Sequence, residues 1–433
     1  MNYSKQIQEM VKYFKNSEKT VDNFKIGIEF EHYIVDKDTL KTISYYGKDG
    51  VAETLKELEN KGWTASYEGE YILGLEKGLK TVTLEPGSQF ELSIDAQKEI
   101  VDIEREYLGF LEEIIPILEK KNQGIMTTGY HPETKIDDIK LLPKKRYDFM
   151  FNYFKTKGSH AHNMMKGTAA LQVSLDYKSE EDYRKKFRIA NAISPILYAL
   201  FDNAFYFEGE EWGKYNLRTH IWNNCDNDRS GIVDNALEDD FSYTKYAEYI
   251  LSRPPIFIFK GKEVVPTGDK LVKEIFDPED YETSELEHLL TMFFPDVRTK
   301  RYIEIRMMDS VPYPLNLSAV AMLKGIFYNE ESLELAYDYI KDINIDDIIN
   351  SKLDIIENGL KGKLKEKTVL EMGKWLVDLA AKGLKKDERD YLLPLEGMLN
   401  YDMNPYEITK TKEELGKKKA LSWCLLNSNV EMI

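Results

Sequence analysis

The stretch TVTLEPGSQFELS, residues Thr81–Ser93, carries two glutamates on either side of a Pro-Gly dipeptide. Apolar residues alternate with polar ones on both sides of this break: Val82, Leu84, Phe90 and Leu92. The alternation predicts a half-buried strand with a kink at Pro86-Gly87. Glu85 and Glu91 are six positions apart, about 20 Å on a straight strand. They would therefore reach one site only if the chain bends, and otherwise they serve different sites.

The composition restricts the class of protein. The chain has 433 residues, of which 42% are hydrophobic and 31% charged, and its formal net charge is −17. It is long enough for two or three domains, or for one large domain with helical additions. An acidic surface argues against nucleic acid or an anionic membrane as the main partner. The two cysteines form neither a disulfide framework nor a zinc motif.

The N-terminal segment is charged from its start, and no stretch approaches eighteen uninterrupted apolar residues. We therefore expect no signal peptide, no membrane span and a cytoplasmic location.

Helices and hairpin-like connections alternate along the chain. Helical periodicity predicts helices over 1–20, 95–122 and 179–204, and a mostly helical region after Leu315. The segment 218–231 is turn-rich and polar, 253–265 reads as a hairpin, and the last clear strand is RTKRYIEIRMMD, 298–309. This order favours an α+β fold over a doubly wound sheet. We expect one catalytic domain, 1–433, with a sheet-bearing core over 21–315 and a helical part over 316–433.

Four predicted strands share one pattern, with apolar residues on one face and carboxylates, amides and cations on the other. The polar faces carry Glu29 and Glu31, Glu91, Gln172, and finally Lys300, Glu304 and Arg306. His32 falls on the apolar face. A sheet with one face in water has a similar alternation. Glu is a poor strand former, however, and side chains two positions apart lie only about 7 Å from each other. We therefore favour a functional face over a solvated one.

Clustered carboxylates need cations. Carboxylate and amide oxygens are hard ligands that suit Mg²⁺ or Mn²⁺ better than zinc. Neighbouring Arg and Lys side chains can stabilise phosphoryl oxygens. The chain contains no G-x-x-x-x-G-K-[ST] motif and no G-x-G-x-x-G after a strand. The pattern indicates metal-bridged nucleotide chemistry on an antiparallel sheet.

Six motifs occur in an order that resembles the plant and proteobacterial type of glutamate–cysteine ligase: IGIEFEHY, TLEPGSQFELS, KKRYDFMFNYF, TAALQVSLDY, RTHIWNNCDNDRSG and FFPDVRTKRYIEIR. The resemblance covers about residues 25–330. It implies a glutamine-synthetase-like fold in which helices surround a curved, mostly antiparallel six-stranded sheet that forms a funnel. It also implies that ATP phosphorylates the γ-carboxylate of L-glutamate and that the amine of L-cysteine displaces the phosphate.

The resemblance also assigns roles to residues. It implies two or three Mg²⁺ ions, or Mn²⁺, held by Glu29, Glu31, Glu85, Glu91, Gln172 and Glu304. Arg306 matches the arginine that faces the transferring phosphoryl group, and Lys300 is a further phosphate contact. Arg146 and Arg229 match arginines associated with glutamate.

Three other interpretations remain open. The chain could be a ligase of the same mechanism with a different amine acceptor, a non-catalytic nucleotide- or amino-acid-binding regulator, or a protein whose polar face is merely solvated. His160 and His162 share one face of a predicted strand, and we expect them to be surface or substrate-loop residues rather than metal ligands.

Overall fold

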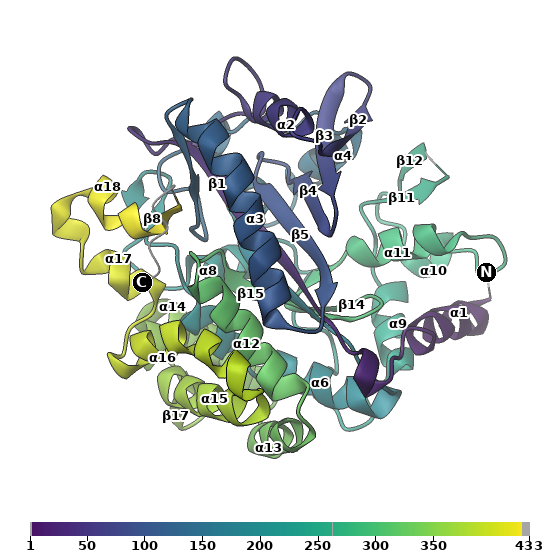
Figure 1. Ribbon diagram of the computed structural model, residues 1–433. Helices are drawn as coiled ribbons and strands as arrows, with labels where there is room; N and C mark the ends of the chain where they lie inside the picture. Colours follow the sequence, from purple (N-terminus) through teal and green to yellow (C-terminus); the bar gives the residue numbers. More distant parts are fainter. Residues whose placement is uncertain (1, 262, 427–433) are drawn as a thin grey trace.

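The computed structural model describes residues 2–261 and 263–426, and its central element is one large antiparallel sheet (Figure 1). The strands follow one another across the sheet in the order β14 (Val297–Thr299), β15 (Ile303–Asp309), β7 (Ala170–Leu175), β1 (Ile26–Asp36), β5 (Phe90–Gln97), β4 (Lys80–Leu84), β3 (Tyr71–Lys77) and β2 (Thr64–Glu68). β6 (Gln123–Met126) pairs with the C-terminal part of β1, and β18 (Leu425–Leu426) pairs with β6. The expected α+β class is confirmed, but within the described residues the main sheet has ten strands rather than six.

The stretch Thr81–Ser93 is a β-hairpin, so the prediction of one kinked strand is wrong. Leu84 pairs with Phe90 across β4 and β5. The amide of Ser88 donates to the carbonyl of Glu85 at 2.8 Å, and Ser88 adopts a φ of 71°. Proline, glycine and serine are residues that favour tight turns, and here they reverse the chain instead of bending it.

A second hairpin replaces the strand expected over 298–309. Arg298 of β14 lies directly opposite Glu304 of β15, and Lys300 lies in the connecting turn. In both hairpins the alternation of apolar and polar residues continues through a short turn, so periodicity alone does not reveal the reversal of the chain.

Helices cover the apolar back of the sheet. α3 (Ile100–Glu119) lies against β5 and β6, and α12 (Leu315–Phe327) against β1 and β7 (Figure 1). Phe30 of β1 is buried with its ring centroid 4.5 Å from that of Tyr107 in α3. His32 lies on the same side, 3.0 Å from the Tyr107 hydroxyl, as its place on the apolar face predicted. Burial of these residues orients the polar side of β1 away from α3.

The remaining helices have the following bounds: α1 Tyr3–Lys15, α2 Val51–Glu59, α4 Lys145–Phe154, α5 Ala161–Gly167, α6 Glu180–Ala192, α7 Ser194–Leu200, α8 Leu217–Asn223, α9 Tyr243–Leu251, α10 Val272–Ile275, α11 Thr283–Thr291, α13 Glu330–Ile340, α14 Ile345–Asn358, α15 Val369–Gly383, α16 Leu393–Asn400, α17 Pro405–Lys410 and α18 Lys417–Ala420. The short strands outside the main sheet pair as β8 (Tyr206–Phe207) with β9 (Glu210–Glu211), β10 (Ser230–Gly231) with β13 (Phe294–Pro295), β11 (Phe257–Lys260) with β12 (Glu263–Pro266), and β16 (Lys363–Leu364) with β17 (Lys367–Thr368). The β11–β12 pair confirms the hairpin expected over 253–265. None of the helices in the described part of the chain is long and apolar enough to cross a membrane.

Several helix predictions need correction. The helix expected over 179–204 is two helices, because Pro195 has no amide proton and cannot continue the α6 hydrogen-bond ladder. α8 occupies part of the segment expected to be turns, and it buries Leu217 and Ile221 at helical spacing. The helix expected from residue 95 begins only at Ile100, because β5 extends to Gln97.

His160 and His162 also differ from expectation. His160 is the N-cap residue of α5 and His162 lies inside that helix, so the two do not share a strand face. The ring of His162 stacks on Phe151 with centroids 4.2 Å apart. Nearly all of α5 is buried, and its apolar residues Ala161, Met164 and Met165 pack in the core.

Candidate active site

The four strands with polar faces are immediate neighbours, in the order β15, β7, β1 and β5. Their register brings the polar residues together: Glu29 lies opposite Gln172, Glu31 opposite Glu91, and Glu304 opposite Ser174. The β4–β5 hairpin adds Glu85, which lies near enough to Glu91 to act on it electrostatically. The sheet therefore gathers the predicted carboxylates on one face.

Glu304 is the centre of a buried ion-pair network. Its side chain is fully buried, and its Oε2 accepts from Nε of Arg298 at 2.6 Å and from Nη1 of Arg306 at 3.1 Å. Nζ of Lys300 lies 3.0 Å from its Oε1. Burial by itself would raise the pKa of Glu304, but the three cations hold it well below its ordinary range. Glu304 thus fixes the positions of three positive side chains on the polar face.

Arg306 is also linked to the carboxylates through Gln172. Its Nη1 donates to the Gln172 side-chain oxygen, and the amide nitrogen of Gln172 donates to Oε1 of Glu31 at 2.9 Å. The pairing of β15 with β7 shifts register between Ile305 and Met308, so Arg306 lies at a β-bulge. Bulges redirect side chains beside functional sites.

The other carboxylates on this face have too few cations nearby. Glu29, Glu31 and Glu91 form no ion pair with Lys, Arg or His in the described part of the chain. Burial, followed by the charges of Glu91 and Glu304, raises the pKa of Glu29 to about 7. Burial and Glu85 raise the pKa of Glu91 to about 7, and the pKa of Glu31 is also well above its ordinary value. Glu31 is buried and Glu29 and Glu91 are half-buried, and this crowding of oxygen donors has the chemistry that a hard divalent cation would stabilise.

Glu29, Glu31, Glu85 and Glu91 form a carboxylate row rather than a closed cage. Within 2–261 and 263–426, no three His, Cys, Asp or Glu side chains converge on one point. The backbone amide of Ala170 donates to Glu31 at 2.6 Å, and Thr83 donates to Glu91 at 2.7 Å. The donor set nevertheless fits Mg²⁺, which binds through a few carboxylates and keeps several waters.

Arg146 and Arg229 lie in different environments. Arg146 is close enough to Glu85 for their charges to interact, and its buried Nε has no hydrogen-bond partner among the described residues. Arg229 is fully buried, 2.7 Å from Asp226, and it also donates to Tyr153 and to the carbonyl of Pro254. The structure therefore does not bring Arg229 to the carboxylate row.

Two arginines of this site were missed by the sequence reasoning. Arg298 is an even number of positions from Lys300 and Glu304, so alternation alone could have placed it on the same face. Arg218 on α8 gave no such signal because its segment was read as turns. It is buried, donates from Nη2 to the carbonyl of Arg306 at 3.0 Å, and leaves Nε and Nη1 without partners among the described residues.

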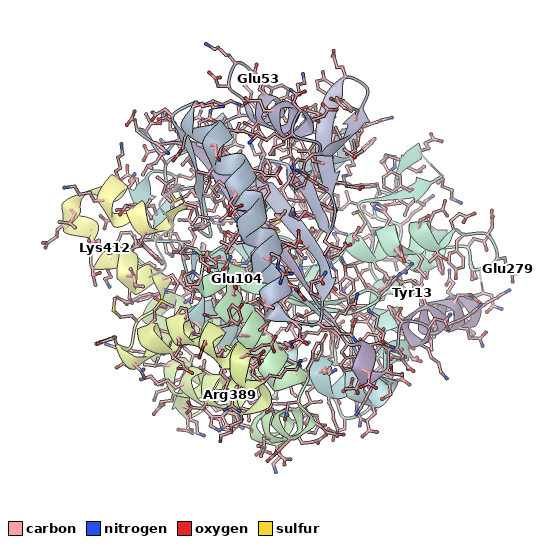
Figure 2. All side chains as sticks on the ribbon, in the orientation of Figure 1. Tyr13, Glu53, Glu104, Glu279, Arg389 and Lys412 are labelled. Carbon is pink, nitrogen blue, oxygen red and sulfur yellow. The ribbon has the colours of Figure 1, made fainter. Side chains whose placement is uncertain are left out.

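A cleft of about 750 Å³ opens at one end of the carboxylate row. Glu29, Ser93 and Ser174 form its inner end, and residues of α1, including Lys12 and Tyr13, form a wall. In Figure 2, Tyr13 lies where α1 meets the body of the fold. The cleft offers aromatic, apolar and cationic groups near Glu29, and four more carboxylates also line it: Glu9, Glu18, Asp95 and Asp176.

Comparison with known proteins decides the family. Residues 25–401 match the family model described as glutamate-cysteine ligase family 2. This chain belongs to the glutamate–cysteine ligase family. The family match extends beyond residue 330, where the resemblance in the sequence weakened, and includes most of the C-terminal helices.

Relatives of this glutamate–cysteine ligase family member support the assignment. The chain is 32% identical over 387 residues to the chloroplastic glutamate–cysteine ligase of Nicotiana tabacum, covering 88% of this chain and 74% of that protein. It is 31% identical over 411 residues to chloroplastic glutamate–cysteine ligase B of Oryza sativa subsp. japonica, covering 92% and 82%. The fold is similar to that of the glutamate–cysteine ligase of Francisella tularensis in complex with AMP, with a TM-score of 0.59, 13% identity and coverage of 94% and 88%.

Proposed function

We propose that this chain ligates the γ-carboxylate of L-glutamate to the amine of L-cysteine, using ATP, and forms γ-glutamylcysteine, ADP and phosphate. The observation that carries the proposal is the combination of the carboxylate row with the Glu304-centred cation network on one sheet face. Carboxylates that bind metal and cations that bind phosphate are the two requirements of phosphoryl transfer. The names of the plant relatives identify the same reaction.

Two or three Mg²⁺ ions, or Mn²⁺, held by Glu29, Glu31, Glu85, Glu91 and Glu304 with Gln172, would neutralise oxygens of the nucleotide phosphates and the γ-carboxylate. Arg306 donates to the γ-phosphoryl oxygens as they transfer, and Lys300 adds a second positive charge. In the structure both oxygens of Glu304 contact cations, so a metal ion on Glu304 would take the place of one of them, for example Lys300 on Oε1. Arg306 already lies on the polar face, where the phosphoryl group would arrive.

The substrates would enter from opposite ends of the row. ATP occupies the 750 Å³ cleft, so that its phosphates reach Glu29 at the inner end. Arg218 lies near Arg306 and Glu31, further along the strands, and its two unpartnered nitrogens suit a substrate carboxylate. Arg146 contacts glutamate from the Glu85 side, whereas Arg229 would support Tyr153 and the surrounding loops.

We further propose that 1–433 act as one catalytic domain with a funnel-shaped site and a cytoplasmic location. Support for the single domain is the packing of α12 against β7 and of α15 against α7.

The test is ADP release by the purified protein with ATP, Mg²⁺ and L-glutamate across a panel of amines that includes L-cysteine. We expect strong stimulation by L-cysteine and γ-glutamylcysteine in the mass spectrum. Stimulation by a different amine would retain the ligase mechanism and change the acceptor. Absence of ADP release with every amine, from folded protein, would overturn the proposal in favour of a non-catalytic binding protein.

A further inference from the structure

A second cleft, of about 800 Å³, lies in the helical layer behind the sheet. It is formed by Glu104 of α3, by Tyr313 and Pro314 before α12, by the 3₁₀ segment Lys386–Leu392, and by α16 and α17. Figure 2 labels Glu104 of α3, which lines this cleft, and Arg389 of the neighbouring 3₁₀ segment, which does not. None of its lining residues belongs to the carboxylate row or to the 750 Å³ cleft.

Every charged residue that lines this second cleft is acidic. Glu104, Asp387 and Asp390 form no ion pair in the described part of the chain. The hydroxyls of Tyr313 and Tyr391 donate to the two oxygens of Glu104 at 2.8 and 2.6 Å, which fixes the carboxylate without neutralising it. Lys385, Lys386 and Arg389 are basic but do not line the cleft, and Lys385 interacts electrostatically with Asp387 from outside it. An occupant would meet a lining whose charged groups are all negative.

The rest of the lining is mostly apolar, and two of its large side chains are exposed. Leu393 is 57% exposed and Tyr401 is 81% exposed, the largest value among the large hydrophobic side chains that the structure describes. Pro394, Met398 and Met403 lie beside them. Exposed apolar residues gathered around a concavity are typical of protein interaction sites, and Tyr is enriched among the residues that dominate binding energy. Methionine adapts to the shape of what it contacts.

We propose that this cleft binds a basic segment of another protein. Lys and Arg combine a positive head with an apolar stem, so they can place the head on the carboxylates and the stem on the tyrosine rings. Apolar neighbours in the partner segment pack on Leu393 and Tyr401. The net charge of −17 accelerates encounter with a positively charged segment. The proposal does not rest on the catalytic activity.

The experiment uses the full chain and a fluorescein-labelled peptide, GKLRYKLRG, with the acidic counterpart GELEYELEG as a control. Fluorescence anisotropy is measured with the wild-type protein and with Asp387→Asn/Asp390→Asn. We expect binding of the basic peptide only, weakened about tenfold in this double variant. The matched control is Glu238→Gln/Asp346→Asn, which removes the same charge from exposed acids that do not line the cleft and should bind as the wild type does.

The apolar part of the proposal has its own variant, Leu393→Ser/Tyr401→Ser, which should also weaken the basic peptide about tenfold. Equal binding to both charge-neutralised double variants would overturn the proposal, because it would reduce the interaction to general attraction by an acidic surface. Equal binding of the acidic peptide would do the same. If light scattering shows a wild-type dimer that Leu393→Ser/Tyr401→Ser converts to a monomer, a second copy fills the cleft and the proposal is also overturned.

Discussion

Glu31 of β1 and Glu91 of β5 lie directly opposite each other on neighbouring antiparallel strands. Like charges at such positions destabilise a sheet. Backbone and side-chain donors contact the two carboxylates, but no Lys or Arg of the described residues forms an ion pair with either. The fold therefore retains an electrostatic repulsion that a bound cation would relieve, and this repulsion can be measured.

The first prediction concerns pH. The folded-state pKa values of Glu29 and Glu91 are both raised to about 7 from an ordinary 4.5. The folded protein then binds protons more tightly than the unfolded chain, so this contribution to stability is present below about pH 4.5 and is lost as pH rises to 7. In EDTA, we expect the thermal midpoint to fall between pH 5 and 7.5. The fall should be smaller in Glu29→Gln/Glu91→Gln, and an identical slope would contradict the assignment of the effect to these groups.

The second prediction contrasts two glutamates on the same face. Glu304→Gln leaves Arg298, Lys300 and Arg306 without their buried counter-charge and should lower the free energy of unfolding by about 3–5 kcal/mol. Glu29→Gln removes a repelled charge and should leave stability unchanged or raise it. Both variants should lose ligase activity. Urea unfolding in EDTA at pH 8 measures the contrast, and greater destabilisation by Glu29→Gln would refute our description of the network.

The third prediction concerns Arg306. Arg306→Lys keeps the charge but loses the planar guanidinium, whose Nη1 contacts both Glu304 and Gln172. We expect kcat to fall about 10²–10³-fold, the effect typical of removing one transition-state donor. Steady-state kinetics measure it, with Arg105→Lys on the exposed side of α3 as the control that retains activity. A change in KM alone would place Arg306 in ground-state binding instead.

The fourth prediction separates the two substrates. Arg218→Gln should raise KM for L-glutamate by about 10–100-fold, the loss typical of a hydrogen bond to a charged group. KM for ATP should stay nearly constant, because the 750 Å³ cleft lies at the other end of the row. Initial-rate measurements with each substrate varied in turn provide the test. The opposite pattern would reverse our orientation of the substrates.

The fifth prediction concerns the β4–β5 turn. A Cβ on Gly87 would lie 2.3 Å from the carbonyl oxygen of Lys166. Because this oxygen belongs to the backbone, it cannot move away as the end of a flexible side chain could. Gly87→Ala should therefore lower the free energy of unfolding by about 1–3 kcal/mol and reduce kcat by displacing Glu85 and Glu91. Gly109→Ala in α3, where a Cβ meets nothing within 4 Å, is the control and should stabilise by about 0.5–1 kcal/mol. Equal behaviour of the two variants in chemical denaturation would contradict the close approach.

Much of the polar face was predictable because side chains alternate across a strand. Ile28 and Phe30 had to be buried together, which left Glu29 and Glu31 on the other side. Alternation likewise placed Gln172 and Glu304 on the polar face. It did not reveal either hairpin, because the turns over 85–89 and 300–302 leave the alternation almost intact while they reverse the direction of the chain.

The sequence by itself therefore determined which residue types share a face, the α+β class and, through its ordered motifs, the family. Only the tertiary structure decided which of these residues meet. Strand order brought Glu31 against Glu91, and the β14–β15 hairpin placed Arg298 opposite Glu304. The packing of α8 places Arg218 in contact with the carbonyl of Arg306. Arg229 instead forms a separate buried ion pair with Asp226. Periodicity is a local property of the backbone, whereas partners across a sheet are chosen by long-range burial and register, which no single segment encodes.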